Sequence, residues 1–128
     1  MTELEQHIRA KNDKTRAWVA EDPDNRWAML PVEDAAHWAE YGVHTVAEYE
    51  LFNARAELWD VYKDIHGIRP RWMGVWDMPL EAVQAELESL YAEARAEREA
   101  EEAEATAHEK AVRDALSQNP LVQRLEIA

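Results

Sequence analysis

Between Pro79 and the pair Asn119-Pro120 the chain contains neither glycine nor proline, and alanine and glutamate are abundant there. Proline is tolerated in the first turn of a helix but interrupts its interior, while alanine and glutamate favour helix. The sequence therefore predicts one long helix that begins at Asp77. Thr106 followed by Glu109 has the spacing of a capping box, so a separate short helix could instead start there.

The long helix is expected to be amphipathic only in its first half. Residues 95–110 offer no apolar face, so we expect a solvent-exposed helical arm. The tail, residues 121–128, is apolar again and must pack on the core, on a second copy or on a partner. We therefore expect a core domain over residues 1–94, with an arm and tail over 95–128 that do not fold independently. The apolar stripe of the first half comprises Leu80, Val83, Leu87, Leu90, Tyr91 and Ala94.

The preceding part of the chain also carries helix signals. Thr2 with Glu5 and Thr45 with Glu48 both have the capping-box spacing that begins a helix. We expect helices over about residues 3–20, 32–41 and 46–66, with Gly42 and Gly67 as left-handed terminators. The predicted fold class is all-α: a small helical bundle with a long charged C-terminal helix and an extended Arg69-Pro70-Arg71 connector.

Composition excludes several classes of function. The 128 residues include no cysteine, so disulfides, thiolate nucleophiles and cysteine-ligated zinc are absent. The net charge of −13 argues against direct binding to a nucleic-acid backbone. The N-terminus has no basic and apolar leader pattern, and no run is long enough to span a bilayer. We expect a soluble, intracellular protein.

The third predicted helix has two apolar faces, one of which includes Leu58 and the other Phe52 and Trp59. Such a helix is expected to be central in the bundle. Between the faces runs an acidic ridge that could imitate a row of phosphates or could simply be solvated. The ridge comprises Glu50, Asn53, Glu57, Asp60 and Asp64.

A basic and aromatic island spans residues 61–72, across the end of this helix, in a chain where acids are expected to dominate everywhere else. In an extended segment Arg69 and Arg71 would point to one side, and Ile68, Pro70 and Trp72 to the other. The basic side could bind a phosphate, a nucleotide or an acidic partner. Alternatively, both arginines could clamp the segment to the chain's own carboxylates, such as Asp60, Asp64 or Asp77. The candidate binding residues are Lys63, His66, Arg69, Arg71, Trp72 and Trp76.

No catalytic or metal-ligating motif is present. With only three glycines there is no phosphate-binding loop, and both serines fall inside predicted helix. His37 and His44 could meet nearby glutamates, but their spacing matches no single helix face. We expect no enzyme activity, catalytic residue, metal or cofactor.

The chain presents, in order, Trp38 to Thr45, Tyr62-Lys63-Asp64, Gly67 to Trp72 and a helix start at Leu80-Glu81. This order resembles small uncharacterised proteins of tailed bacteriophages. The resemblance covers about residues 38–90, and its most specific element is Tyr62-Lys63-Asp64-x-x-Gly67-x-Arg69-Pro70-Arg71. It implies a phage origin and expression in the host cytoplasm, and small non-enzymatic phage proteins commonly bind host proteins.

Three hypotheses follow. The first is an accessory protein whose acidic surface binds and inhibits or redirects a host defence or nucleic-acid-handling protein. The second is a small-ligand protein that holds a nucleotide or phosphate compound with its Arg-Pro-Arg-Trp segment. The third is a virion or assembly component that oligomerises through the C-terminal arm and tail.

Overall fold

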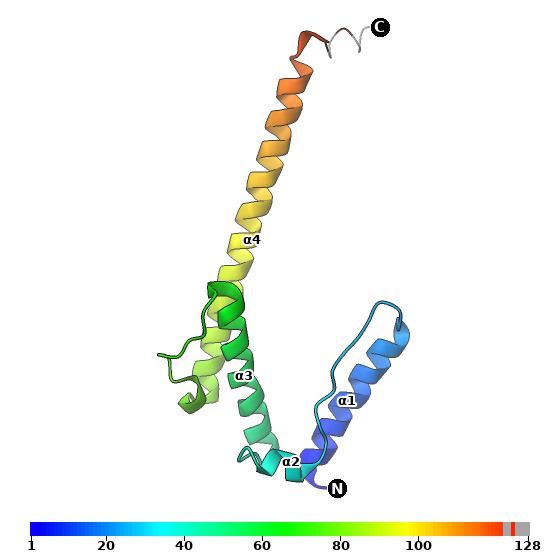
Figure 1. Ribbon diagram of the computed structural model, residues 1–128, viewed down its shortest axis with the longest axis vertical. Coiled ribbons are helices and arrows are strands. Elements are labelled where there is room, and N and C mark those ends of the chain that lie inside the picture. The colour runs from blue at the N-terminus through cyan, green and yellow to red at the C-terminus, as the bar shows by residue number, and fades with distance from the viewer. Residues whose placement is uncertain (122–123, 125–128) are drawn as a thin grey trace. The chain divides into compact units, whose positions relative to one another are not determined.

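The computed structural model describes residues 1–121 and 124, and within them the chain is all-α (Figure 1). Its elements are α1 (Glu3–Glu21), α2 (Ala35–Ala39), α3 (Val46–His66), the short 3₁₀ helix η1 (Val75–Asp77) and α4 (Leu80–Ser117). The chain divides into two compact units, Met1–Gln84 and Ala85–Ala128. The division lies inside α4, before the boundary expected at residue 94.

The capping box at Thr2 is confirmed in full, and at Thr45 the bond to the helix amide is present without the reciprocal bond. The Thr2 hydroxyl accepts from the Glu5 amide at 3.1 Å, and the Glu5 carboxylate accepts from the Thr2 amide at 2.9 Å. At the start of α3 the Thr45 hydroxyl accepts from the Glu48 amide at 3.1 Å. Each bond satisfies an amide that has no partner within its own helix.

α2 is shorter than expected. The Asp34 carboxylate accepts from the amide of Ala36 at 3.0 Å, which begins the helix at Ala35 rather than at residue 32. The chain leaves the helix after Ala39, and Gly42 then has a φ of 72°, the left-handed conformation expected of it.

The first core lies where α1, α2 and α3 meet. Trp38 lies edge-on to Tyr49 at 4.9 Å and to Phe52 at 5.8 Å between ring centroids. Its indole N–H donates to the carbonyl of Val32 at 2.7 Å, so the ring is buried with its polar atom satisfied. We call this group the corner core; its buried members are Leu4, Ile8, Trp38, Val43 and Tyr49.

The segment between α1 and α2 runs back along α1 without secondary structure (Figure 1). Asn12 is buried on α1, and its amide donates to the carbonyl of Pro31 at 3.0 Å and to Glu33 at 3.1 Å. Arg26 donates to the carbonyl of Trp18 at 2.8 Å. Hydrogen bonds from side chains of both α1 and the segment therefore hold the segment against the helix, and we call it the strap.

A second small core lies where α3, η1 and the first turn of α4 come together. Leu58, Val75 and Val83 are fully buried, and Pro70 is buried as well. The Arg55 guanidinium donates twice to the carbonyl of Met78, at 3.0 and 2.7 Å. This pair of hydrogen bonds fixes the chain just before α4. The helix begins at Leu80, three residues after the expected start, because η1 occupies the intervening residues.

α4 is one continuous helix of 38 residues, about 57 Å at 1.5 Å per residue. The Thr106 hydroxyl donates to the carbonyl of Glu102 at 2.8 Å, as a threonine inside a helix does, so the separate short helix is wrong. In the second unit Leu87 and Leu90 are buried, whereas all described residues after Ala94 are exposed. The expected exposed arm is confirmed; of the tail, residues 122–123 and 125–128 lie outside the described part.

Among the described helices, none combines the length and the apolar character that crossing a membrane requires.

Candidate functional site

The island is built as a tight turn at the end of α3. Gly67 has a φ of 82° and its amide donates to the carbonyl of Lys63 at 2.7 Å, which ends the helix. The Arg71 amide then donates to the carbonyl of Arg69 at 2.9 Å, closing a γ-turn around the buried Pro70. The Met73 amide donates to the carbonyl of Pro70 at 3.1 Å.

These turns overturn the expected alternation of an extended segment. A γ-turn reverses the chain within three residues, so side chains two positions apart do not share a side. Of the three residues expected to face inward, only Pro70 does so. Ile68 is 59% exposed and Trp72 is 64% exposed.

Arg69 acts as an internal clamp. Its guanidinium donates to Asp60 at 2.5 Å and to the carbonyl of Trp59 at 3.2 Å, and it lies 5.8 Å from the centre of the Trp59 ring. All three contacts are with α3, so Arg69 ties the turn to the helix that precedes it. The internal-clamp alternative is confirmed for this arginine.

Arg71 and Lys63 behave differently. Both side chains are exposed, and neither makes a hydrogen bond or ion pair with another described residue, 1–121 or 124. The clamp interpretation is therefore wrong for Arg71. Its charge is available to a molecule outside the chain.

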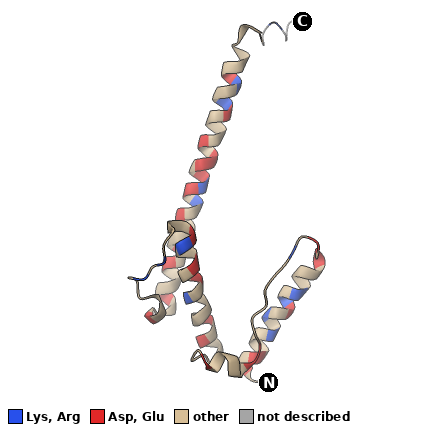
Figure 2. Cartoon of the chain, in the orientation of Figure 1, with Lys and Arg blue, Asp and Glu red and all other residues tan. Residues whose placement is uncertain are grey.

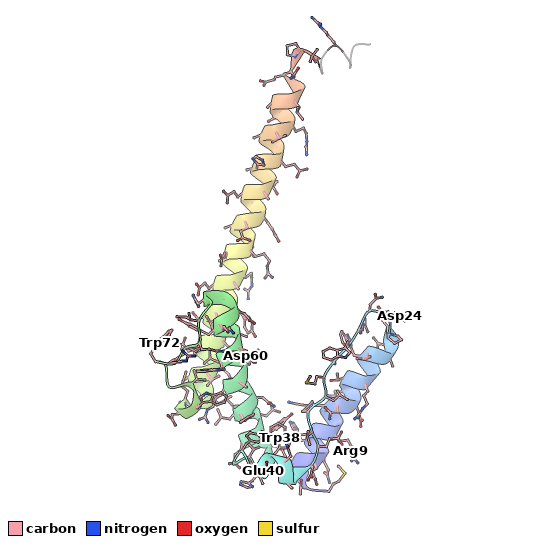
Figure 3. The ribbon with its side chains drawn as sticks, viewed as in Figure 1. Arg9, Asp24, Trp38, Glu40, Asp60 and Trp72 are labelled. Atoms are coloured by element: carbon pink, nitrogen blue, oxygen red, sulfur yellow. The ribbon has the colours of Figure 1, made fainter. Side chains whose placement is uncertain are left out.

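The aromatic candidate residues form two separate sets of ring contacts. Trp72 lies edge-on to Tyr62 at 5.5 Å, and Tyr62 lies 4.7 Å from the ring of His66. Trp76, 44% exposed, contacts Phe52 and Trp59 at 6.0 and 6.1 Å. Trp72 lies on the loop that projects from the end of α3 (Figure 3). We call the exposed group Lys63, Arg71 and Trp72 the binding turn.

The acidic ridge is not a row of free carboxylates. Glu50 accepts from His7 at 2.6 Å and also from the Lys11 ammonium. The hydrogen bond from Lys11, followed by that from His7, holds the pKa of Glu50 below its ordinary value. Asp60 is engaged by Arg69, and Asn53 is half-buried. Glu57 and Asp64 are exposed, and at least two of the four acidic positions, Glu50 and Asp60, already have partners within the chain.

A metal centre has no support in the described part of the chain, where no three His, Asp or Glu side chains converge. His37 packs instead against Trp38 and Tyr41, with ring centroids 5.2 and 5.4 Å apart.

Sequence reasoning missed a second basic region. Residues 9–16 carry four bases and one acid, so the expectation that acids dominate outside the island is wrong (Figure 2). Arg9 donates to the Glu33 carboxylate at 2.8 Å, and Arg16 donates to the same carboxylate at 3.4 Å. The hydrogen bonds from Arg9 and then from Asn12 lower the pKa of Glu33 to about 2. A local count of charges would have revealed this region.

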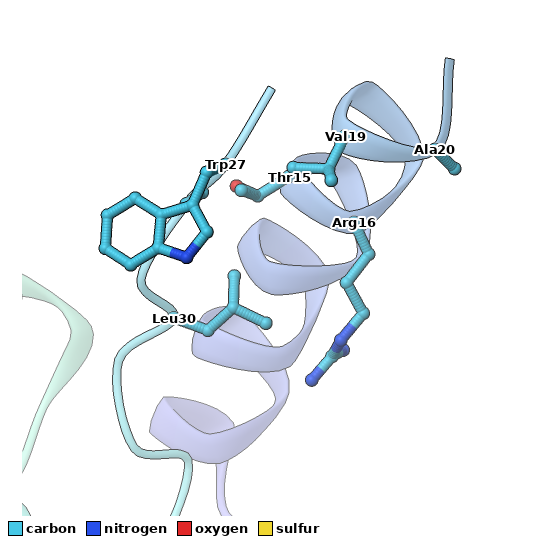
Figure 4. Close-up of a pocket in the computed structure, with 7 residues that line it drawn as sticks. Thr15, Arg16, Val19, Ala20, Trp27 and Leu30 are labelled. Carbon is cyan, nitrogen blue, oxygen red and sulfur yellow. The ribbon is translucent and has the colours of Figure 1, made fainter. Parts of the chain in front are cut away.

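It also missed an apolar groove beside that region. The groove, about 260 Å³, lies between the second half of α1 and the strap (Figure 4). Trp18, in the same half of α1, is 48% exposed, because only the first half of α1 contacts the corner core. The groove is lined by Thr15, Arg16, Val19, Ala20, Trp27, Ala28 and Leu30.

Comparisons of the chain with protein-family models, with curated proteins and with solved structures found no match. The resemblance to tailed-phage proteins therefore stays a prediction.

Proposed function

We propose that this chain is a non-enzymatic binding protein that contacts a host protein through the binding turn. One observation supports this most: Arg71 is exposed and unpaired among the described residues, while Arg69, two positions earlier, holds the turn in place. Arg69 thus stabilises the turn, and Arg71 can bind another molecule. Arginine and tryptophan are also the residue types most enriched where interface energy is concentrated.

The chemistry of the turn suggests the kind of partner surface. A guanidinium recognises a carboxylate or phosphate through two parallel hydrogen bonds, and Lys63 adds a second positive charge nearby. The Trp72 ring would enter an apolar pocket. The partner surface therefore presents an acidic group beside such a pocket.

We therefore assign partner binding to the binding turn and not, as the first hypothesis had it, to the acidic ridge. Glu50 and Asp60 already have internal partners, and detaching them would cost those contacts. The phage origin, the host cytoplasm, and a role in inhibiting or redirecting the partner rest on the family resemblance alone.

A nucleotide or phosphate ligand is the weaker alternative for the same residues. Small-molecule sites are concave and bury most of their ligand. Trp72 at 64% exposure and the exposed Arg71 offer a ligand little enclosure. A partner protein can supply the pocket that encloses these two side chains, so we favour a protein over a small ligand.

An assembly role is favoured by a different observation, the exposed apolar side chains near the end of α4. Val112 is 45% exposed, Leu116 54% and Leu121 66%. They lie far along the chain from the binding turn and concern self-association rather than capture of a host protein.

The proposal is tested by capture from a bacterial host lysate, with mass spectrometry of the bound proteins. We expect the unmodified chain to retain a partner that the double variant Arg71→Ala, Trp72→Ala loses. A matched control, Arg98→Ala with Trp27→Ala, removes one exposed arginine and one exposed tryptophan elsewhere and should retain the partner.

Equal capture by all three proteins would remove the binding turn from the function. A nucleotide released from the purified, denatured chain, and absent from the Arg71 and Trp72 double variant, would instead support the small-ligand alternative.

A further inference from the structure

A cavity of about 140 Å³ lies between α3 and the turn that precedes it. Its wall is the turn at residues 41–43, where Gly42 takes the left-handed conformation that reverses the chain. Its floor is one face of α3, because positions spaced i, i+3, i+4 and i+7 share a side of a helix. The floor residues are Glu48, Leu51, Phe52 and Arg55.

Arg55, at one end of this floor, is a half-buried charge without an anion. Within residues 1–121 and 124 its hydrogen-bond partner is the carbonyl of Met78, which accepts from Nε and Nη2, and it has no ion-pair partner. The guanidinium edge formed by Nη1 and Nη2 is therefore unused, and such an edge binds a carboxylate through two parallel bonds. Charges withdrawn from water are ordinarily paired. Because Arg55 also lines a cavity, an anionic group from outside the chain would complete it.

A carboxylate lies at the other end of the floor. Glu48 precedes Arg55 by two helical turns, about 10.5 Å along the axis. Its Oε1 atom accepts from the His44 amide at 3.3 Å and from the Thr45 hydroxyl at 3.1 Å, while Oε2 accepts from none of the described residues. Glu48 and Arg55 form no ion pair with each other. The cavity thus has opposite charges at its two ends, each with an unused hydrogen-bonding atom.

The middle of the floor is apolar. Leu51 and Phe52 are half-buried, and the Phe52 ring lies 5.7 Å from the ring of Tyr41, which is 57% exposed. Leu51 and Phe52 can cover methylene groups but cannot form hydrogen bonds. Along α3 the cavity therefore presents an acid, an apolar surface and a base, in that order.

Size and charge decide which ligand fits. The cavity has room for about ten water-sized groups, fewer than the atoms of a nucleotide. A simple anion would be repelled by Glu48 and by a chain whose net charge is −13, and a simple cation would be repelled by Arg55. A zwitterion has no net charge and can satisfy both ends.

We propose that this cavity binds a small zwitterion whose ammonium and carboxylate groups are separated by a short apolar chain. The carboxylate accepts from the unused edge of Arg55, and the ammonium donates to Oε2 of Glu48. The apolar chain lies on Leu51 and Phe52. No residue of the binding turn lines the cavity, so this site goes beyond the proposed function.

The test is an NMR titration of the full chain with ε-aminocaproate, followed at the amide signals of Gly42 and Val43 in the cavity wall. We expect both signals to shift and to saturate. Hexanoate and hexylamine each lack one of the two charges and should bind at least about tenfold more weakly. L-leucine contains the same atoms as ε-aminocaproate but carries its charges on adjacent carbons, and it should also bind at least about tenfold more weakly.

The acidic end is tested on the protein as well. Glu48→Gln keeps an oxygen acceptor for His44 and Thr45 but removes the charge, so it should fold and bind ε-aminocaproate about tenfold more weakly. Circular dichroism checks its helix content. Asp64→Asn removes an exposed carboxylate of α3 outside the cavity and should bind like the unmodified chain. The basic end is tested on the ligand alone, because Arg55 also holds Met78.

Absence of a saturable shift with ε-aminocaproate would overturn the proposal. Equal binding of hexanoate would show a plain anion site, equal binding of L-leucine would show that separated charges are not recognised, and unchanged binding by Glu48→Gln would remove the acidic end; each of these also overturns it. The double variant Arg71→Ala, Trp72→Ala should bind ε-aminocaproate normally, and Glu48→Gln should still capture the host partner. Failure of this site and failure of the proposed function are therefore distinguishable.

Discussion

The corner core and the turn after α3 are both built around tryptophan, but they expose it very differently. Trp38 in the corner is 7% exposed and hydrogen-bonded, whereas Trp72 in the turn is 64% exposed. Burial of an aromatic ring stabilises the fold, and an exposed ring next to an unpaired arginine does not. The comparison separates residues that maintain the structure from residues available for recognition.

The largest effect is expected in the corner core. Trp38→Ala removes a buried ring in edge contact with Tyr49 and Phe52 and should lower the free energy of unfolding by about 3 to 5 kcal/mol. Trp72→Ala should change it by less than about 0.5 kcal/mol. Urea denaturation followed by circular dichroism measures both. Similar losses for the two variants would break the comparison.

A smaller effect is expected for the internal clamp. Arg69→Ala removes the bonds to Asp60 and to the carbonyl of Trp59 and should cost about 1 kcal/mol, since the Asp60 side chain is 67% exposed. A double-mutant cycle with Asp60→Ala isolates the ion pair, and a coupling energy of about 0.2 to 1 kcal/mol is expected. Zero coupling together with zero loss for Arg69→Ala would show that Arg69 does not hold the turn.

The strap provides a pH-dependent prediction. Because the pKa of Glu33 is lowered from 4.5 to about 2, its contribution is fully present above pH 4.5 and is lost as the pH falls toward 2. In thermal denaturation, the melting temperature of Glu33→Gln should therefore fall less than that of the unmodified chain as the pH is lowered. Glu40→Gln, which removes an exposed carboxylate, serves as the control and should follow the unmodified chain. Identical acid profiles for all three would contradict the role of Glu33.

Much of the fold could be predicted because its signals are local. The N-caps at Thr2 and Thr45 and the glycine at position 67 determine helix ends from neighbouring residues. The run without glycine or proline likewise predicted α4. Such features depend on a few adjacent positions, which a single sequence displays.

The candidate site depended on contacts that a sequence does not display. Glu50 accepts a hydrogen bond from His7, 43 positions away, so an apparent ridge carboxylate already has a partner within the chain. The γ-turn around Pro70 separated Arg69 from Arg71, which a regular extended segment would have kept together. Nothing in the composition distinguishes the buried Trp38 from the exposed Trp72.

The most direct test measures stability and binding on one substitution, Arg71→Ala. We expect its melting temperature to equal that of the unmodified chain while capture of the host partner is lost, and we expect Arg71→Lys to restore little because the two-pronged geometry is absent. A lowered melting temperature would show that Arg71 is a structural residue like Arg69. Full capture at full stability would contradict the account, because the unpaired arginine would then have no part in recognition.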